Sequence, residues 1–272
     1  MTQTEKITFT GATGEALAAR LDLPIGKPHA YALFAHCFTC TKDIYAASRI
    51  AKGLNEHGIA VLRFDFTGLG ASEGEFANTN FSSNVGDLVA AASHMRNQYD
   101  APAILIGHSL GGAAVLAAAA EVPEAKAVCT IGAPADPAHV AHLFQDSRDE
   151  IEAAGEATVL LAGRPFKIQK HFLEDIEAQK LEDHIASMRK ALLVFHSPTD
   201  QTVGVENAGA IFQAAKHPKS FVSLDGADHL LSRHEDAIYV ADVIAAWATR
   251  YMDTPEPAKT TQDMTGETGA VV

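Results

Sequence analysis

Cationic side chains are scarce in this sequence of 272 residues. It contains 21 Lys and Arg against 34 Asp and Glu, which gives a formal net charge of −13 at pH 7. Proteins that bind nucleic acids or anionic membranes attract the negative groups with clustered Lys and Arg. The charge balance therefore argues against nucleic acid and against an anionic membrane surface as partners.

Cysteines and long apolar runs are also few. The three cysteines, Cys37, Cys40 and Cys129, cannot make a disulfide framework, and such usage is typical of a reducing compartment. The longest apolar stretch, residues 110–120, is too short to span a bilayer, and the polar start has no signal-peptide core. We expect a soluble, cytoplasmic protein.

Apolar residues make up 47% of the chain, enough for a large core. Short strand-like runs alternate with longer segments of helical spacing, which predicts an α/β protein with a mainly parallel sheet and helices on both faces. The first two strands form a hairpin candidate. The expected strands are residues 6–10, 17–23, 31–35, 59–64, 103–106, 127–131, 191–195 and 220–224, and the expected helices are 43–57, 82–99, 110–120, 205–216 and 233–251.

The alternation stops between residues 133 and 189. This stretch is rich in charged residues and carries Phe172, Ile176 and Leu181 at helical spacing, with a strand signal at residues 158–161. We interpret it as an inserted helical lid, although an ordinary pair of surface helices would give a similar pattern. The lid belongs to one expected domain, residues 1–252. Residues 253–272, with prolines, glycines and threonines, have the composition of a disordered tail or linker.

The strongest chemical motif is the run Gly-His-Ser-Leu-Gly at residues 107–111. It fits G-x-S-x-G, follows a predicted strand and opens a predicted helix, which is the context of a nucleophile elbow. A sharp turn brings the flanking positions close together, so a Cβ there would clash, while the serine hydroxyl projects from the turn. Ser109 is the expected nucleophile. The alternatives are a glycine-rich turn or a weak phosphate-binding loop.

A serine hydroxyl needs a base to take its proton. In a parallel sheet such groups gather at the carboxyl ends of strands. His229 follows the predicted strand 220–224, whereas His217 precedes that strand and His234 falls in the last helix. His229 is therefore the expected base.

The base needs a carboxylate that orients its ring. Asp200 follows the predicted strand 191–195 and is the expected partner. Asp136, after the preceding strand, is the main rival. Asp225 and Asp228 are too close to His229 in the chain.

Acyl transfer also needs two N–H donors for the oxyanion. The backbone N–H of Leu110, directly after the nucleophile, is one candidate. The other is the backbone N–H of Phe38, in the loop after the strand 31–35.

Two further loops carry weaker signals. The Cys37-x-x-Cys40 pair could serve redox or metal chemistry, but no second ligand pair is evident, so two small residues in a tight loop is the simpler interpretation. Residues 65–74 contain several glycines but no Lys and no phosphate-binding fingerprint, so we interpret them as a structural loop near the pocket. We expect no cofactor and no metal.

The elbow, the loop 65–74, Asp200 and His229, in this order, resemble the α/β-hydrolase family over about residues 6–251. The resemblance implies an α/β-hydrolase fold with an eight-stranded sheet, serine catalysis on acyl substrates and no cofactor. By motif position, Ser109 would be the nucleophile, Asp200 the acid partner and His229 the base. The chain looks like the lidded esterases of the serine-aminopeptidase and feruloyl-esterase type.

The segment Ala-His-Cys-Phe-Thr-Cys-Thr-Lys-Asp at residues 35–43 further resembles hydrolase domains that are fused to an OsmC-like peroxide-reducing domain. That resemblance implies an OsmC-type partner domain. Many relatives have Gly where this chain has Cys37 and Cys40.

The expected function is a serine carboxylic-ester hydrolase that acts on small or medium acyl esters. A peptidase or a thioesterase would use the same residues and stays open as an alternative. A non-catalytic binding or redox-accessory module is a third.

Overall fold

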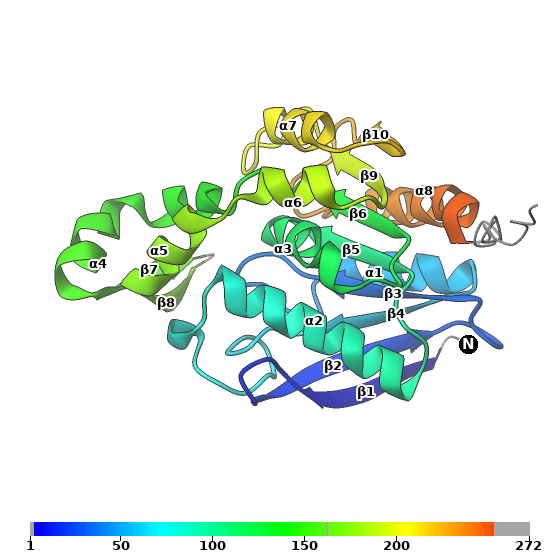
Figure 1. Ribbon diagram of the computed structural model, residues 1–272, viewed down its shortest axis with the longest axis horizontal. Helices are drawn as coiled ribbons and strands as arrows, with labels where there is room; N and C mark the ends of the chain where they lie inside the picture. The colour runs from blue at the N-terminus through cyan, green and yellow to red at the C-terminus, as the bar shows by residue number, and fades with distance from the viewer. Residues whose placement is uncertain (1–2, 162, 253–272) are drawn as a thin grey trace, which may run out of the picture.

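The computed structural model describes residues 3–161 and 163–252, so the expected tail at residues 253–272 lies outside it. Its centre is an eight-stranded sheet, as the family resemblance implies (Figure 1). The strands are β1 (Gln3–Thr10), β2 (Ala16–Leu23), β3 (Ala30–Ala35), β4 (Ile59–Phe64), β5 (Ile104–His108), β6 (Ala127–Ile131), β9 (Ala191–His196) and β10 (Lys219–Ser223). Their order in the sheet is β1-β2-β4-β3-β5-β6-β9-β10.

The sheet is mostly parallel, as predicted. Strands β1 and β2 form the expected antiparallel hairpin, and β2 also pairs antiparallel with β4. Every other pairing in this sheet is parallel. The hairpin turn uses Gly14 at a φ of +102°, a conformation that side chains disfavour. Parallel pairing directs the ends of β5, β6, β9 and β10 to one edge of the sheet.

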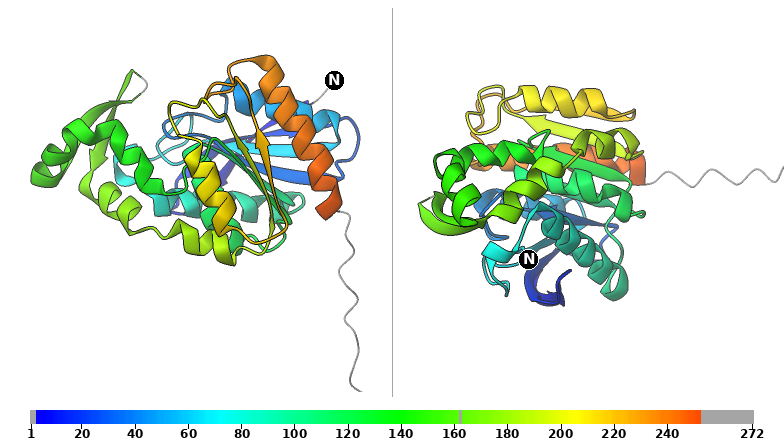
Figure 2. Two further views of the ribbon diagram at one scale, coloured as in Figure 1. Left: turned by 90° about the horizontal axis from the view of Figure 1, so that it is seen from above. Right: turned by 60° about the vertical axis from the view of Figure 1, so that its left-hand side comes forward.

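Helices cover both faces of this sheet (Figures 1 and 2). They are α1 (Tyr45–Glu56), α2 (Phe81–Gln98), α3 (Leu110–Ala118), α7 (Glu206–Ala214) and α8 (His234–Met252), with short 3-10 helices η1 (Phe76–Asn78) and η2 (Ala119–Glu121). Helices α1 and α8 bury one apolar cluster against the sheet, and α2, α3 and α7 bury the other. Both faces of the central strands are therefore buried, whereas β1 is largely exposed and β10 is only partly buried. No helix within the described ranges is long and apolar enough to cross a bilayer.

Between β6 and β9 the chain leaves the sheet and forms an insertion, residues 137–187, that projects from one end of the molecule (Figure 2). It consists of η3 (Pro137–Ser147), α4 (Arg148–Ala154), β7 (Glu156–Leu161), β8 (Arg164–Gln169), α5 (Lys170–Ala178) and α6 (Leu181–Ser187). The helices were expected, but the antiparallel pair β7 and β8 shows that the insertion is not purely helical. Ala157, Val159 and Leu161 alternate inward along β7, which is the strand period.

Candidate active site

Ser109 occupies the sharp turn between β5 and α3, with φ +55° and ψ −127°. A Cβ on Gly107 would collide with the backbone of Gly111, and a Cβ on Gly111 would collide with the carbonyls of Ala35 and His36. The Ser109 N–H donates to the Ile131 carbonyl at 2.9 Å, which anchors the turn to the neighbouring strand. The two glycines of the motif are thus required by close backbone approach, and the serine stands at a strained, fixed position.

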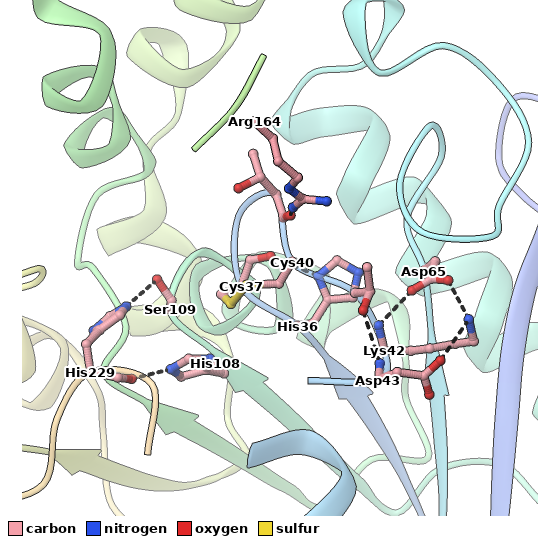
Figure 3. Close-up of a disulfide and its surroundings, with 12 residues drawn as sticks. His36, Cys37, Cys40, Lys42, Asp43, Asp65, His108, Ser109, Arg164 and His229 are labelled. Carbon is pink, nitrogen blue, oxygen red and sulfur yellow. Dashed lines mark hydrogen bonds and ion pairs between the residues drawn. A yellow bond between two sulfur atoms is a disulfide. The ribbon is translucent and has the colours of Figure 1, made fainter. Parts of the chain in front are cut away.

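The structure brings Ser109, His229 and Asp200 together. The His229 Nε2 lies 3.0 Å from the Ser109 Oγ, and its Nδ1 lies 2.7 Å from the Asp200 Oδ2 (Figure 3 shows the serine and the histidine). They come from loops after β5, β9 and β10, separated by up to 120 residues along the chain. One imidazole therefore bridges a hydroxyl and a carboxylate.

The Asp200 carboxylate is almost fully buried, with 1% of its side chain exposed, while His229 is 11% exposed. Burial by itself would raise the pKa of Asp200. Hydrogen bonds from His229 and from the N–H groups of Val203 and Thr202 outweigh burial and bring the pKa of Asp200 below its usual value. The carboxylate is therefore charged at neutral pH and can stabilise a cationic imidazole.

The rival carboxylates make other contacts. Asp136 accepts a hydrogen bond from the Ala138 N–H at the start of η3, and Asp228 accepts one from the Ser232 N–H. Asp225 accepts one from the Ser223 hydroxyl.

His108, which the sequence analysis did not single out, holds the loop that carries His229. Its Nε2 donates to the His229 carbonyl oxygen at 2.7 Å, and its ring is buried (Figure 3). Burial, and then the nearby charge of His229, lower the pKa of His108 to about 4. His108 is thus neutral at pH 7 and donates from Nε2. No sequence signal marks it, because it fills the variable position before the serine.

The two expected oxyanion donors lie beside the elbow. Parallel pairing sets Ala35 opposite Gly107, so the loop after β3 starts next to the turn that carries Ser109. Phe38 and Leu110 line one small cavity. Among the described residues, neither of their backbone N–H groups donates to another protein atom. Two residues with free backbone N–H groups therefore line the same cavity.

The loop after β3 differs from the expectation in one respect. Cys37 and Cys40 are joined by a disulfide, with their Cα atoms 5.3 Å apart, and are not simply two small residues (Figure 3). A turn explains the pairing, because the Cys40 N–H donates to the Cys37 carbonyl at 3.0 Å. Cys129 is free and buried in β6.

The loop 65–74 contacts the segment that follows β3 and carries Phe38, which is called the oxyanion loop below. Its first residue, Asp65, is buried and accepts hydrogen bonds from the backbone N–H and the Nζ of Lys42, at 2.6 and 2.5 Å. The Ala71 N–H donates to the same carboxylate at 2.9 Å. Phe66 and Leu69 line the cavity that Phe38 and Leu110 border. This loop therefore has the structural role near the pocket that its sequence predicts.

The insertion contacts two loops of the site, the loop after β3 and the loop after β9. The Arg164 guanidinium donates to the Thr39 carbonyl of the oxyanion loop, and the His139 Nε2 donates to the Thr202 carbonyl, 3.0 Å away, beside Asp200. The Phe38 ring also packs on Phe172 of α5, with ring centres 5.6 Å apart.

In the described part of the chain, no three His, Cys, Asp or Glu side chains are grouped to hold a metal ion.

Comparison with known proteins shows the family to which the chain belongs. Residues 26–147 match the family model described as serine aminopeptidase, S33. The chain is 58% identical to a structure described as the esterase domain from a Rhodothermus marinus protein, with a TM-score of 0.76 over 92% of this chain and 99% of that one. The chain belongs to the α/β-hydrolase superfamily.

Two more distant proteins are also similar to this chain, one in structure and one in sequence. Est1E from Butyrivibrio proteoclasticus, solved with ferulic acid bound, is 22% identical with a TM-score of 0.76, over 91% of this chain and 100% of that one. Rat monoglyceride lipase is 32% identical over 117 residues, which are 42% of this chain and 38% of the lipase. The chain is thus an enzyme of the serine-hydrolase type. The OsmC-type partner domain stays a prediction.

Proposed function

We propose that this hydrolase cleaves small or medium carboxylic esters through an acyl-enzyme on Ser109, with His229 as base and Asp200 as its partner. The observation that carries the proposal is the unbroken series of hydrogen bonds from the Ser109 Oγ through His229 to Asp200.

The first step is proton transfer from the Ser109 hydroxyl to the His229 Nε2 as the oxygen attacks the acyl carbonyl. The Asp200 carboxylate accepts from Nδ1, which leaves Nε2 free to receive the proton. Because the Asp200 carboxylate is charged and almost fully buried, it stabilises the imidazolium that forms.

The attack turns the carbonyl oxygen into an oxyanion. The N–H groups of Phe38 and Leu110 receive it, and the N-terminus of α3 adds a favourable dipole. His229 then protonates the leaving alcohol, and a water molecule activated by His229 releases the acid from Ser109.

Aromatic rings surround Phe38, an apolar setting that favours an acyl or aromatic group. Its ring lies between Phe76 of η1 and Phe172 of α5, with ring centres 5.8 and 5.6 Å away. These contacts support an acyl-ester substrate, recognised where the insertion faces the oxyanion loop.

The direct test replaces the nucleophile. Ser109→Ala is expected to lower turnover of a short p-nitrophenyl ester by roughly three to six orders of magnitude while the melting temperature stays near that of the parent. The control is Ser187→Ala, at an exposed serine that ends α6 and bonds only to nearby carbonyls. If Ser109→Ala hydrolysed the ester at the parent rate, the proposed mechanism would be wrong.

Labelling and a substrate panel separate the alternatives. A fluorophosphonate is expected to modify Ser109, as mapped by mass spectrometry, whereas a non-catalytic module would not react. An esterase hydrolyses acyl esters faster than aminoacyl amides or acyl-CoA; the opposite ranking would favour the peptidase suggested by the family model's description, or a thioesterase.

A further inference from the structure

We propose that Cys37 and Cys40 form a thiol–disulfide exchange site for dithiol reductants, and that the state of their bond sets the position of the Phe38 N–H. The proposal rests on the proposed function, because Phe38 matters as an oxyanion donor. It gives the pair a role outside the proton relay of Ser109, His229 and Asp200.

The disulfide closes a ring that contains the oxyanion donor. Only Phe38 and Thr39 lie between the two cysteines. Thr39 has a φ of +60°, a region that β-branched residues rarely adopt and that therefore needs outside constraint. The covalent closure supplies such a constraint directly beside Phe38.

Residues on both sides of the ring make contacts that do not involve its sulfur atoms. Before it, the buried His36 donates from Nδ1 to the Cys37 carbonyl at 2.8 Å. After it, Lys42 is held by the buried Asp65 at 2.5 Å. Because both flanks stay anchored, loss of the sulfur–sulfur bond changes the short turn and leaves the rest of the fold in place.

Cys37 and Cys40 differ in exposure. Cys37 is 5% exposed, whereas Cys40 is only partly buried. Cys40, the less buried residue, is therefore the expected point of attack for an external thiolate. Cys129 is completely buried in β6, and burial raises the pKa of its thiol, so it does not compete as an attacking thiolate.

The reaction is a two-electron exchange. One thiolate of the dithiol attacks the Cys40 sulfur, a mixed disulfide forms, and Cys37 leaves as a thiolate that takes up a proton. The second thiolate of the reductant then attacks the reductant's first sulfur, which is bonded to Cys40 in the mixed disulfide. Cys40 leaves as a thiolate and takes up a proton. The dithiol becomes a cyclic disulfide, and the protein gains two thiols.

Reduction removes the covalent restraint on the turn, which the Cys40–Cys37 backbone hydrogen bond and the Arg164 contact at Thr39 then hold alone. With the turn less restrained, the Phe38 N–H is expected to move away from the oxyanion. Complete loss of one oxyanion donor costs about 10²–10³ in kcat. We therefore expect the reduced enzyme to have a kcat lower by about tenfold to a thousandfold, with the loss reversed on reoxidation.

The experiment poises the whole chain at a series of dithiothreitol ratios and measures three quantities. They are the alkylation of each cysteine by mass spectrometry, the kcat for a short p-nitrophenyl ester and the thermal unfolding curve. Cys37→Ser/Cys40→Ser is expected to show the low kcat without any response to dithiothreitol. Cys129→Ala, the matched control, is expected to keep the parent kcat and the full response.

The results are decisive in either direction. A fall in kcat that follows alkylation of Cys37 and Cys40, in a protein that stays folded, supports the proposal. It is overturned if dithiothreitol leaves the bond intact, if both forms have the same kcat, or if reduction unfolds the chain. If neither form hydrolyses esters or reacts with a fluorophosphonate, the proposed function itself fails, and this inference fails with it.

Discussion

At the scale of single residues, Asp200 divides its two oxygens between two tasks. Its Oδ2 meets the His229 Nδ1 at 2.7 Å, and its Oδ1 accepts the N–H groups of Thr202 and Val203 at 2.8 and 3.0 Å. The backbone bonds fix the direction of the carboxylate, so the histidine ring it contacts is fixed as well. The loop after β9 therefore supplies both the carboxylate and the N–H groups that orient it.

The Asp200→Asn variant tests this division. The amide keeps the shape of the side chain but loses its charge and favours the wrong imidazole tautomer, so kcat is expected to fall by about 10⁴. Asp136→Asn is the matched control, because Asp136 caps η3 through the Ala138 N–H. Steady-state ester hydrolysis measures both variants, and a loss smaller than about tenfold in Asp200→Asn would remove Asp200 from the proposed role.

The sequence was informative for residues that end strands. Ser109, Asp200 and His229 could be predicted because parallel strands direct their carboxyl ends to one edge. His108 could not, because its role depends on the His229 carbonyl, which lies 121 residues away in the chain. The disulfide was also missed, since the same Cys-x-x-Cys spacing fits an open turn as well as a closed one.

At the scale of elements, the insertion is linked to both chemical loops of the site. Arg164 of β8 donates to the Thr39 carbonyl in the oxyanion loop, and His139 of η3 donates to the Thr202 carbonyl next to Asp200. The insertion therefore helps to hold both loops in position.

Arg164→Gln measures the first of these links. The shorter, neutral side chain gives up the charged hydrogen bond to the Thr39 carbonyl, so kcat/KM is expected to fall by about tenfold, since such bonds contribute about 1.5–3 kcal/mol. Arg148→Gln is the control within the same insertion, because Arg148 pairs only with the exposed Glu152 and Glu177. Equal values for the two variants would show that the Arg164 link has no effect on the reaction.

Most elements of the core could be predicted from sequence, and the insertion only in part. The core strands are continuous apolar runs, such as residues 191–195, because both of their faces are buried. In β8, by contrast, only Phe166 and Ile168 alternate with polar residues, and two apolar positions are too short a pattern to predict a strand. Its pairing with β7 depends on the turn at Gly163, where φ is +75°.

At the scale of the whole molecule, buried histidines make stability depend on pH. His108 and His36 are both buried, and burial is the main cause that lowers the pKa of each. For His108 the folded pKa is about 4, against 6.5 for the free side chain. Between these two values the unfolded chain binds a proton that the folded chain does not, so acid favours unfolding.

The free energy of unfolding is therefore expected to fall as the pH is lowered from 6.5 to about 4. The share of His108 is about 3 kcal/mol, at about 1.4 kcal/mol per pH unit. His108→Gln removes that share, so urea unfolding at several pH values is expected to show a shallower decline than in the parent. The control is His234→Gln, at an exposed position that begins α8. Parallel curves for parent and His108→Gln would contradict the assignment.

The position of the site in the sheet has a consequence for the newly made chain. The nucleophile follows a central strand, but its partners follow β9 and β10, and β10 is the edge strand of the sheet. On the proposed mechanism, a nascent chain that ends just before residue 229 already contains the Ser109 turn and the whole insertion but lacks the base. Ester hydrolysis would therefore begin only after β10 has been made and has paired with β9.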